Sequence, residues 1–205
     1  GNNIEAIAVT DHYRISDSVG LINAARAAGI FVFGGFEAAS DDGVHFLCLY
    51  DPDKVGSLER LIGEFGVRDH KALSPNGNKN CLKLLECVRE QGGIAIAAHV
   101  VAEHGLLAPL EGQPRMNVWK SRDLYACALP GSTSDAPQNF RVLENKDAAH
   151  RRERPVAVIN VSDVNSPEDL AEKRSSCFIK MAALSVEGLC QAFLDPDSRI
   201  RLNSD

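Results

Sequence analysis

Aromatic side chains are scarce in this sequence of 205 residues, and long hydrophobic runs are missing. Phe, Trp and Tyr make up 6% of the chain, whereas 44% of its residues are hydrophobic and 24% are charged. This balance excludes a disordered or collagen-like chain. No apolar run approaches the roughly 18 residues that would span a bilayer, so we expect no membrane partner. The sequence predicts a single cytoplasmic domain over residues 1–205, large enough to bury a core.

An excess of positive charge is also missing. Lys and Arg number 22 against 28 Asp and Glu, which gives a formal net charge of −6. A chain of this charge has no diffuse positive field that could hold a nucleic-acid backbone. Any contact with nucleic acid would therefore be local.

Paired cysteine motifs are the third absence. The six cysteines form no C-x-x-C pair and fall mostly within apolar runs. This pattern favours buried free thiols in a reducing compartment, and the alternatives are disulfides or a cysteine-based zinc site.

Short apolar runs alternate with amphipathic segments, which is typical of an α/β fold. The predicted strands are residues 4–9, 30–36, 44–50, 94–98, 156–161 and 178–181. Apolar residues at helical spacing predict helices over 17–28, 55–65 and 79–91. Capping residues predict two more helices, which begin after Ser166 and Ser185. The segments 66–78 and 100–118 have little periodicity, and we expect them to be long binding loops or lids.

Side chains that can bind metals follow directly after four predicted strands. They are Asp11 and His12 after 4–9, Glu37 after 30–36, His99 after 94–98, and Asp163 after 156–161. The carboxyl ends of parallel strands meet at one edge of an α/β sheet, where sites are built. We therefore expect these side chains to converge.

His45 stands at the start of its predicted strand rather than at the end. Only residues 38–43 separate Glu37 from the strand 44–50, which is about the length of a hairpin connection. If the two strands are antiparallel, the start of one lies beside the end of the other. His45 would then join Glu37.

Three histidines with two or three carboxylates suit Zn²⁺, Mn²⁺ or Fe²⁺ better than the all-oxygen sites of Ca²⁺ or Mg²⁺. A carboxylate can bridge two such ions. Two metals about 3.5–4 Å apart can stabilise both the attacking and the leaving oxygen in phosphoester cleavage. The pattern therefore indicates metal-assisted hydrolysis.

Each of these residues also has an ordinary structural role open to it. A histidine after a strand can be a hydrogen-bonded core or loop residue, Glu37 can pair with an arginine, and Asp163 can cap a helix. Only their joint placement favours a metal site. We interpret His70, His104 and His150 as solvated, with His104 the one most suited to approach the site.

Five short motifs occur in a recognisable order. They are Ala8-Val9-Thr10-Asp11-His12, Gly35-Phe36-Glu37, Val44-His45-Phe46-Leu47, Ala97-Ala98-His99 and Ser162-Asp163. In this order they resemble the PHP (polymerase and histidinol phosphatase) domain, over residues up to about 165. Residues 179–181 and 185–202 resemble the end of the PHP region in proteins that fuse it to an AAA-like ATPase.

The resemblance implies a distorted, seven-stranded β/α barrel whose zinc or manganese ions, two or three in number, hydrolyse phosphate esters through a metal-bound hydroxide. Carried over by position, the implied metal ligands are His12, Glu37, His45, His99 and Asp163. Glu37 would bridge the metals, and Glu37, His99 and Asp163 would be the catalytic residues. Asp11 would either bind the metal or orient the His12 ring without contacting the metal itself.

The sequence departs from the PHP pattern at two places. Such domains open with a His-x-His pair on the first strand, and no such pair precedes Ile4. The last motif is usually Asp-x-His, but Asn165 stands where the histidine is expected. An amide is a weak ligand for these metals, so we expect one of three metal positions to be poor or empty.

The leading hypothesis is a metal-dependent phosphoesterase, with a basic loop residue that holds the ester. The candidates for this clamp are Arg14, Arg115, Lys120 and Arg122, each of which could equally be a surface charge. The substrate could be a nucleotide, a nucleic-acid end or a small phosphate ester. The alternatives are a catalytically decayed domain that acts as a regulatory or nucleic-acid-sensing module of an NTPase, and a small-molecule-binding domain without metal.

The length gives a last expectation. A β/α barrel typically needs about 250 residues, and this sequence is short where the His-x-His strand should be. We therefore predict a fragment of a longer protein, with its first strand and a C-terminal ATPase domain outside the sequence.

Overall fold

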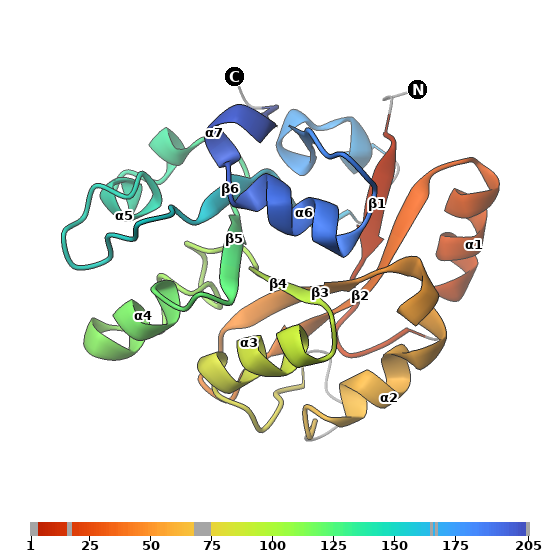
Figure 1. Cartoon of the computed structure of the whole chain (residues 1–205), viewed down its shortest axis with the longest axis horizontal. Coiled ribbons are helices and arrows are strands. Elements are labelled where there is room, and N and C mark those ends of the chain that lie inside the picture. Colours follow the sequence, from red (N-terminus) through yellow and green to blue (C-terminus); the bar gives the residue numbers. More distant parts are fainter. Residues whose placement is uncertain (1–3, 16–17, 68–74, 165, 167, 204–205) are drawn as a thin grey trace.

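A curled, mixed β-sheet with helices on both faces forms the body of the molecule, and a small second sheet lies beside it (Figure 1). The computed structural model describes residues 4–15, 18–67, 75–164, 166 and 168–203. The main sheet contains β1 (Ala6–Val9), β2 (Phe31–Ala39), β3 (His45–Tyr50), β4 (Ile94–Ala97), β5 (Leu124–Ala128) and β6 (Ala157–Ile159). The small sheet pairs β7 (Cys177–Ile179) with β8 (Ile200–Leu202).

The strands of the main sheet stand in sequence order, from β1 to β6. The pairs β1–β2, β4–β5 and β5–β6 are parallel, whereas β3 is antiparallel to both β2 and β4. All strands except β3 therefore run in one direction. Their carboxyl ends and the amino end of β3 lie at the same edge, which we call the carboxyl edge; the opposite one is the amino edge.

The helices return the chain between the strands. They are α1 (Val19–Ala27), α2 (Leu58–Gly63), α3 (Cys81–Glu90), α4 (Gly112–Trp119), α5 (Phe140–Leu143), α6 (Val186–Phe193) and α7 (Pro196–Arg199). Two of them start at side chains that satisfy free backbone N–H groups: Asn80 accepts from Lys83 at 3.0 Å, and Ser185 accepts from Gly188 at 3.0 Å. The predicted helix start at Ser185 is confirmed.

The two faces of the main sheet bury different clusters. On one face, Phe36, Phe46 and Tyr50 pack with residues of α2 and α3. On the other face, α6 covers the sheet with Val186, Leu189 and Phe193, which contact the cluster that contains Phe33, Leu49, Ile94 and Ala157. Figure 1 shows α6 crossing this face, away from α2 and α3. Because side chains alternate along a strand, Glu37 shares the face of Phe33 but lies beyond the part that α6 covers.

The structure confirms the α/β class but not the seven-stranded count. Among the described residues the main sheet is a six-stranded half-barrel. The strand β5 was not predicted, because its Leu-Tyr-Ala-Cys-Ala stretch has no β-branched residue. The second strand is longer than predicted, because its pairing with β3 continues to Ala39 and places Glu37 inside β2.

Two predictions about the connecting segments are wrong. The segment 100–118, expected to be a loop, contains most of α4. The α-helix predicted to begin after Ser166 does not form in the described residues before β7; the chain makes short 3₁₀ turns at Asp169–Ala171 and Lys173–Ser175 instead. This stretch is almost entirely polar, so it has no apolar face with which to pack as a longer helix. The predicted loop 66–78 lies partly outside the described residues. No helix within the described ranges is long and apolar enough to cross a membrane.

Candidate metal centre

The first residues of the candidate site follow β1 and meet the end of β2. The backbone N–H of Glu37 donates to the Asp11 carbonyl oxygen at 3.1 Å, and the N–H of Tyr13 donates to the Glu37 carbonyl oxygen at 3.1 Å. These bonds extend the parallel pairing beyond β1 and place His12 opposite Glu37. Tyr13 turns the chain away with a φ of 44°. The Thr-Asp-His motif is therefore held against β2 by the backbone.

The hairpin between β2 and β3 brings His45 to Glu37. Ala39 pairs with His45 and Glu37 pairs with Leu47, so Glu37 and His45 are diagonal neighbours on one face. The His45 Nδ1 atom lies 2.7 Å from Glu37 Oε1, and both side chains are largely buried. One ligand atom from each of His12, Glu37 and His45 lies within 4.8 Å of the others. The predicted antiparallel pairing of the two strands is confirmed.

His99 reaches the same carboxylate from β4. Its Nε2 atom lies 3.3 Å from Glu37 Oε1, and its backbone adopts a φ of 29°. The turn that follows is closed by bonds from the Ala102 N–H to the His99 carbonyl oxygen and from the Leu107 N–H to the Val100 carbonyl oxygen. A Cβ atom at Gly105 would lie 2.2 Å from the His99 carbonyl oxygen. Only glycine allows this turn to close so tightly.

His104 stacks on His45 with ring centroids 4.8 Å apart and an angle of 7° between the planes. The backbone N–H of His45 also donates to the His104 carbonyl oxygen at 2.9 Å. The side chain is exposed, as we expected, yet it forms part of the wall of the cluster. The expectation that His104 is the histidine most suited to approach the site is confirmed. Sequence spacing does not predict the stacking itself, because the turn that creates it depends on Gly105.

The histidines set the protonation state of Glu37. Burial acts to raise the pKa of its carboxyl group, but hydrogen bonds from His45 and His99 and the charge of His12 outweigh burial and lower the pKa to about 2. In return, the hydrogen bond with Glu37 raises the pKa of His99 against the effect of burial, and the charges of Glu37 and Asp163 add to this rise. Glu37 is therefore an anion at neutral pH.

The donor atoms fit a transition metal. His12 Nδ1 and His99 Nδ1 are buried without a hydrogen-bond partner among the described residues. Buried nitrogens are rarely left in this state in folded proteins. The short contact between His45 and Glu37 needs a proton on the ring, and a divalent cation can take the place of that proton between two lone pairs. Imidazole and carboxylate together are the ligand set that zinc, manganese and iron share.

The other predicted site residues lie apart from this cluster. The Asp11 carboxylate accepts a hydrogen bond from the Ser18 hydroxyl rather than from His12. Asp163 is exposed and makes no hydrogen bond or ion pair with another described residue, although it lies close enough to affect the pKa of His99. Asn165 and His70 lie outside the described residues. The prediction that His150 is solvated is wrong, because its side chain is largely buried and its Nδ1 atom lies 2.7 Å from Asp147 Oδ1.

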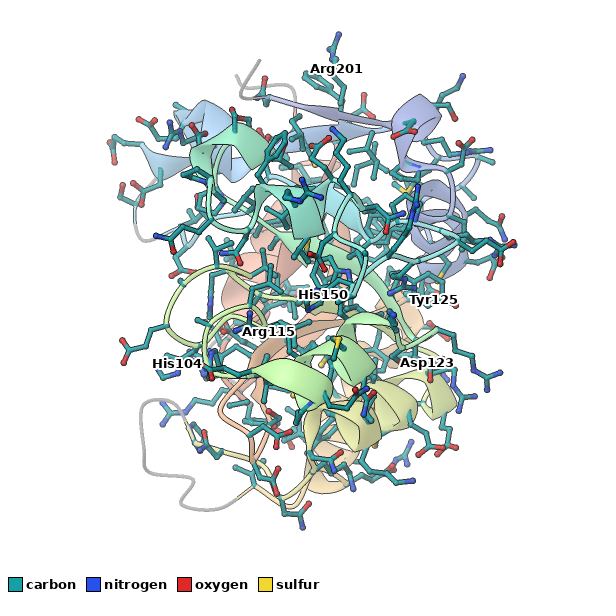
Figure 2. The ribbon with its side chains drawn as sticks, turned by 90° about the vertical axis from the view of Figure 1, so that its left-hand side faces the viewer. His104, Arg115, Asp123, Tyr125, His150 and Arg201 are labelled. Carbon is teal, nitrogen blue, oxygen red and sulfur yellow. The ribbon has the colours of Figure 1, made fainter. Side chains whose placement is uncertain are left out.

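The predicted basic clamp does not form one group. Arg14 and Lys120 are exposed, and the guanidinium of Arg115 donates to the Leu110 carbonyl oxygen. Arg122 lies two residues before β5, whose amino end is at the amino edge, so it cannot serve a site at the carboxyl edge. Figure 2 shows His104 on one side of the molecule, and Asp123 and Tyr125 on the other.

Comparison with known proteins gives matches only among solved structures. No family model and no curated protein matches the chain. A complex of endonuclease Q with a 27-mer duplex substrate carrying an abasic lesion superposes with a TM-score of 0.64 at 12% identity, over 94% of this chain and 48% of that one. The endonuclease Q of Pyrococcus furiosus gives 0.64 and 12%, over 92% and 47%. The chain thus spans about half the length of these proteins.

A third structure adds the name of the fold. It is a two-domain protein from Bacteroides vulgatus described as containing a predicted PHP-like metal-dependent phosphoesterase, with a TM-score of 0.54 and 13% identity over 96% of this chain and 55% of that one. The chain has a PHP-like fold. This confirms the resemblance to the PHP domain that was drawn from the five motifs. The cluster of His12, Glu37, His45 and His99 lies at the carboxyl edge of the sheet.

Proposed function

We propose that this PHP-like domain is a metal-dependent phosphoester hydrolase. One observation carries the proposal: a single buried carboxylate, Glu37, is surrounded by the ring nitrogens of His12, His45 and His99 at the open edge of the sheet. A carboxylate so placed can bridge two metal ions. We propose zinc or manganese, because imidazole and carboxylate ligands suit both.

Each residue of the cluster would have a distinct role in binding the metal. His12, His45 and His99 would hold the metal through neutral ring nitrogens, and Glu37 would supply the negative charge that offsets it. The metal would supply Lewis acidity and a water activated at neutral pH. Asp163 is exposed and close enough for its charge to act on His99, and we propose it as a further ligand. Asp11 would fix the backbone that carries His12.

We propose a nucleic-acid phosphodiester as the substrate class. The likeness in fold to endonuclease Q, which is described in complex with a duplex that contains an abasic lesion, favours this class over a small phosphate ester. The negative net charge of the chain limits the contact to a local patch. We also propose, from the sequence of residues 179–202 alone, that the domain belongs to a longer protein with an ATPase.

The experiment that tests the proposal combines metal analysis with hydrolysis assays. We expect at least about one zinc or manganese ion per chain, as an occupied structural or catalytic site requires. We also expect cleavage of bis(p-nitrophenyl) phosphate and of a duplex oligonucleotide with one abasic site. Both activities should fall by orders of magnitude in Glu37→Gln and in His99→Ala.

Two matched variants serve as controls. Glu59 is an exposed acid on α2, and His150 is a histidine outside the cluster. Glu59→Gln and His150→Ala should keep full metal content and activity. Equal activity in all four variants would contradict the placement of the site.

A second candidate is the catalytically decayed regulatory module. The observation that favours it is the exposed, unpaired side chain of Asp163, which leaves the cluster with one carboxylate among the described residues. This candidate predicts tight metal binding without hydrolysis of either substrate. A protein that binds metal and also cleaves the abasic duplex would eliminate it.

A further inference from the structure

A pocket rich in arginine lies at the amino edge of the sheet. It has a volume of about 440 Å³ and is lined among others by Arg89, Arg122, Asp123, Tyr125, Arg152 and Arg154. These residues come from the end of α3, the start of β5 and the loop before β6. We call this site the arginine pocket. It is on the opposite edge from Glu37, so it is no part of the candidate metal centre.

Positive charge is concentrated in the arginine pocket although the whole chain carries −6. Asp123 is its one lining carboxylate, and that group is shared by two arginines: Arg89 Nε lies 3.2 Å and Arg122 Nε 3.8 Å from Asp123 Oδ1. Arg152 and Arg154 make no ion pair with any described residue. Two positive charges in the pocket are therefore without a carboxylate partner among the described residues.

Arg152 is fixed in place by its surroundings. Its backbone N–H donates to the Asn145 side chain at 2.8 Å, and its carbonyl oxygen accepts from the same side chain at 2.8 Å. One guanidinium nitrogen, Nη1, donates to the Trp119 carbonyl oxygen at 2.6 Å. Arginine carries five N–H groups, and the rest make no hydrogen bond with a described residue. A half-buried cation in this state favours an incoming anion, which restores its lost hydration.

A purely structural role accounts for only some of these arginines. Arg89 lies in the last turn of α3, and Arg152 bonds the last carbonyl of α4, where positive charge complements the helix dipole. Arg154 is exposed, follows no helix and makes no hydrogen bond or ion pair with another described residue. Arg122 is almost fully exposed. Its ion pair with Asp123 is long, at 3.8 Å, and Arg89 lies closer to the same carboxylate, at 3.2 Å. Helix capping therefore leaves Arg122 and Arg154 unexplained.

We propose that the arginine pocket binds a small organic phosphate, of the class of a nucleoside diphosphate. The fork of a guanidinium matches two phosphate oxygens at once, and Arg122, Arg152 and Arg154 offer such forks. Tyr125 and Leu194 are half-buried at the same pocket and supply apolar surface for a base or sugar. The volume lies in the range of small-molecule sites, whereas a nucleic-acid backbone would need an extended basic surface.

Calorimetric titration of the full chain with ADP tests this proposal. The buffer contains a chelator, so that phosphate bound through a metal at the carboxyl edge cannot contribute. We expect ADP to bind, and adenosine, which lacks the phosphates, to bind at least about tenfold more weakly. Arg154→Gln and Arg122→Gln should each weaken ADP binding by roughly tenfold.

The neighbouring Arg151 provides the matched control. It is exposed in the same loop, carries the same charge and does not line the pocket. Arg151→Gln should change the affinity for ADP by less than about twofold, because exposed charges outside a contact are screened by salt. Trp119 is the one tryptophan of the chain. Its fluorescence should respond to ADP in the wild type and in Arg151→Gln, and less in Arg154→Gln.

Four results would overturn the proposal. The first is no ADP binding at millimolar concentration, and the second is an equal loss in Arg151→Gln and Arg154→Gln. If inorganic pyrophosphate bound as tightly as ADP, the base and the sugar would contribute nothing to binding, and the ligand would not be an organic phosphate. Binding of a single-stranded oligonucleotide without binding of ADP would mean a nucleic-acid surface instead of a small-molecule pocket.

Discussion

At the carboxyl edge of the main sheet imidazoles surround one carboxylate, whereas at the amino edge guanidinium groups surround another. Glu37 lies 2.7 Å from His45 and 3.3 Å from His99, and Asp123 lies 3.2 Å from Arg89 and 3.8 Å from Arg122. At both edges, basic side chains surround one acidic side chain. The decisive difference is the lone pair: a neutral imidazole nitrogen can donate one to a metal ion, whereas a guanidinium has none to donate.

This difference assigns opposite ligands to the two edges. Imidazoles with Glu37 can exchange their protons for a divalent cation. Arginines stay protonated in proteins, so with Asp123 they can only attract an anion. The sign of the local charge alone would not separate the two sites, because histidine and arginine are both counted as basic.

The largest expected effect comes from Glu37→Gln, which removes the negative charge that His12, His45 and His99 surround. Metal affinity should fall by more than about a hundredfold, since even the loss of an outer partner of a ligand costs 10- to 100-fold. In the wild type, free zinc or manganese at about 100 times its Kd should raise Tm by roughly 5–10 °C. This rise should vanish in Glu37→Gln. ADP binding at the amino edge should stay unchanged, and a parallel loss of both would refute the independence of the two edges.

Gly105→Ala should disrupt the candidate metal centre at the carboxyl edge, because it displaces the backbone that carries His99. The new Cβ atom would lie 2.2 Å from the His99 carbonyl oxygen and 2.5 Å from the Val100 carbonyl carbon, so the turn that carries His99 must shift. We expect a loss of about 1–3 kcal/mol in the free energy of unfolding, measured by denaturant titration, together with a loss of hydrolysis.

Gly20→Ala is the control for this backbone effect. Gly20 lies in α1, and a Cβ atom there would meet nothing within 4 Å. This variant should be stabilised by roughly 0.5–1 kcal/mol and keep its activity. If Gly105→Ala behaves in the same way as Gly20→Ala, the turn does not position His99.

Asn145→Gly should weaken ligand binding at the arginine pocket without affecting the candidate metal centre. Asn145 has a φ of 55°, which glycine adopts without strain, and the change deletes both side-chain bonds to the Arg152 backbone. We expect ADP binding to weaken by about three- to tenfold, as Arg152 loses its fixed position. The metal content should stay at the wild-type value. An unchanged affinity for ADP would show that Arg152 does not contact the ligand.

The smallest effect is expected for His104→Ala. The exposed ring stacks on His45 at 4.8 Å, a contact worth about 0.5–1.5 kcal/mol when well packed. Metal affinity should fall only a few-fold, measured by competition with a chromogenic chelator. A loss as large as that of Glu37→Gln would mean that His104 is itself a metal ligand.

The comparison of the two edges also separates what could and could not be predicted. The placement of metal-binding side chains after strands predicted that Glu37, His12 and His99 would converge, and the short link 38–43 predicted the hairpin that adds His45. All four side chains meet in the structure. Their roles as ligands, and those of Asp11 and Asp163, stay predictions. The strand β5 was missed because alanine and cysteine give no periodic signal.

The sequence by itself determined the α/β class, the parallel direction of most strands and the carboxyl edge as the place of the metal cluster. It could do so because each of those residues lies within or just after a strand, near the end that strand direction brings to this edge. Only the tertiary structure decided the stacking of His104 on His45 and the existence of the arginine pocket. The arginines at 89, 122, 152 and 154 come from separate segments, and their charges meet because the amino ends of β5 and β6 lie side by side.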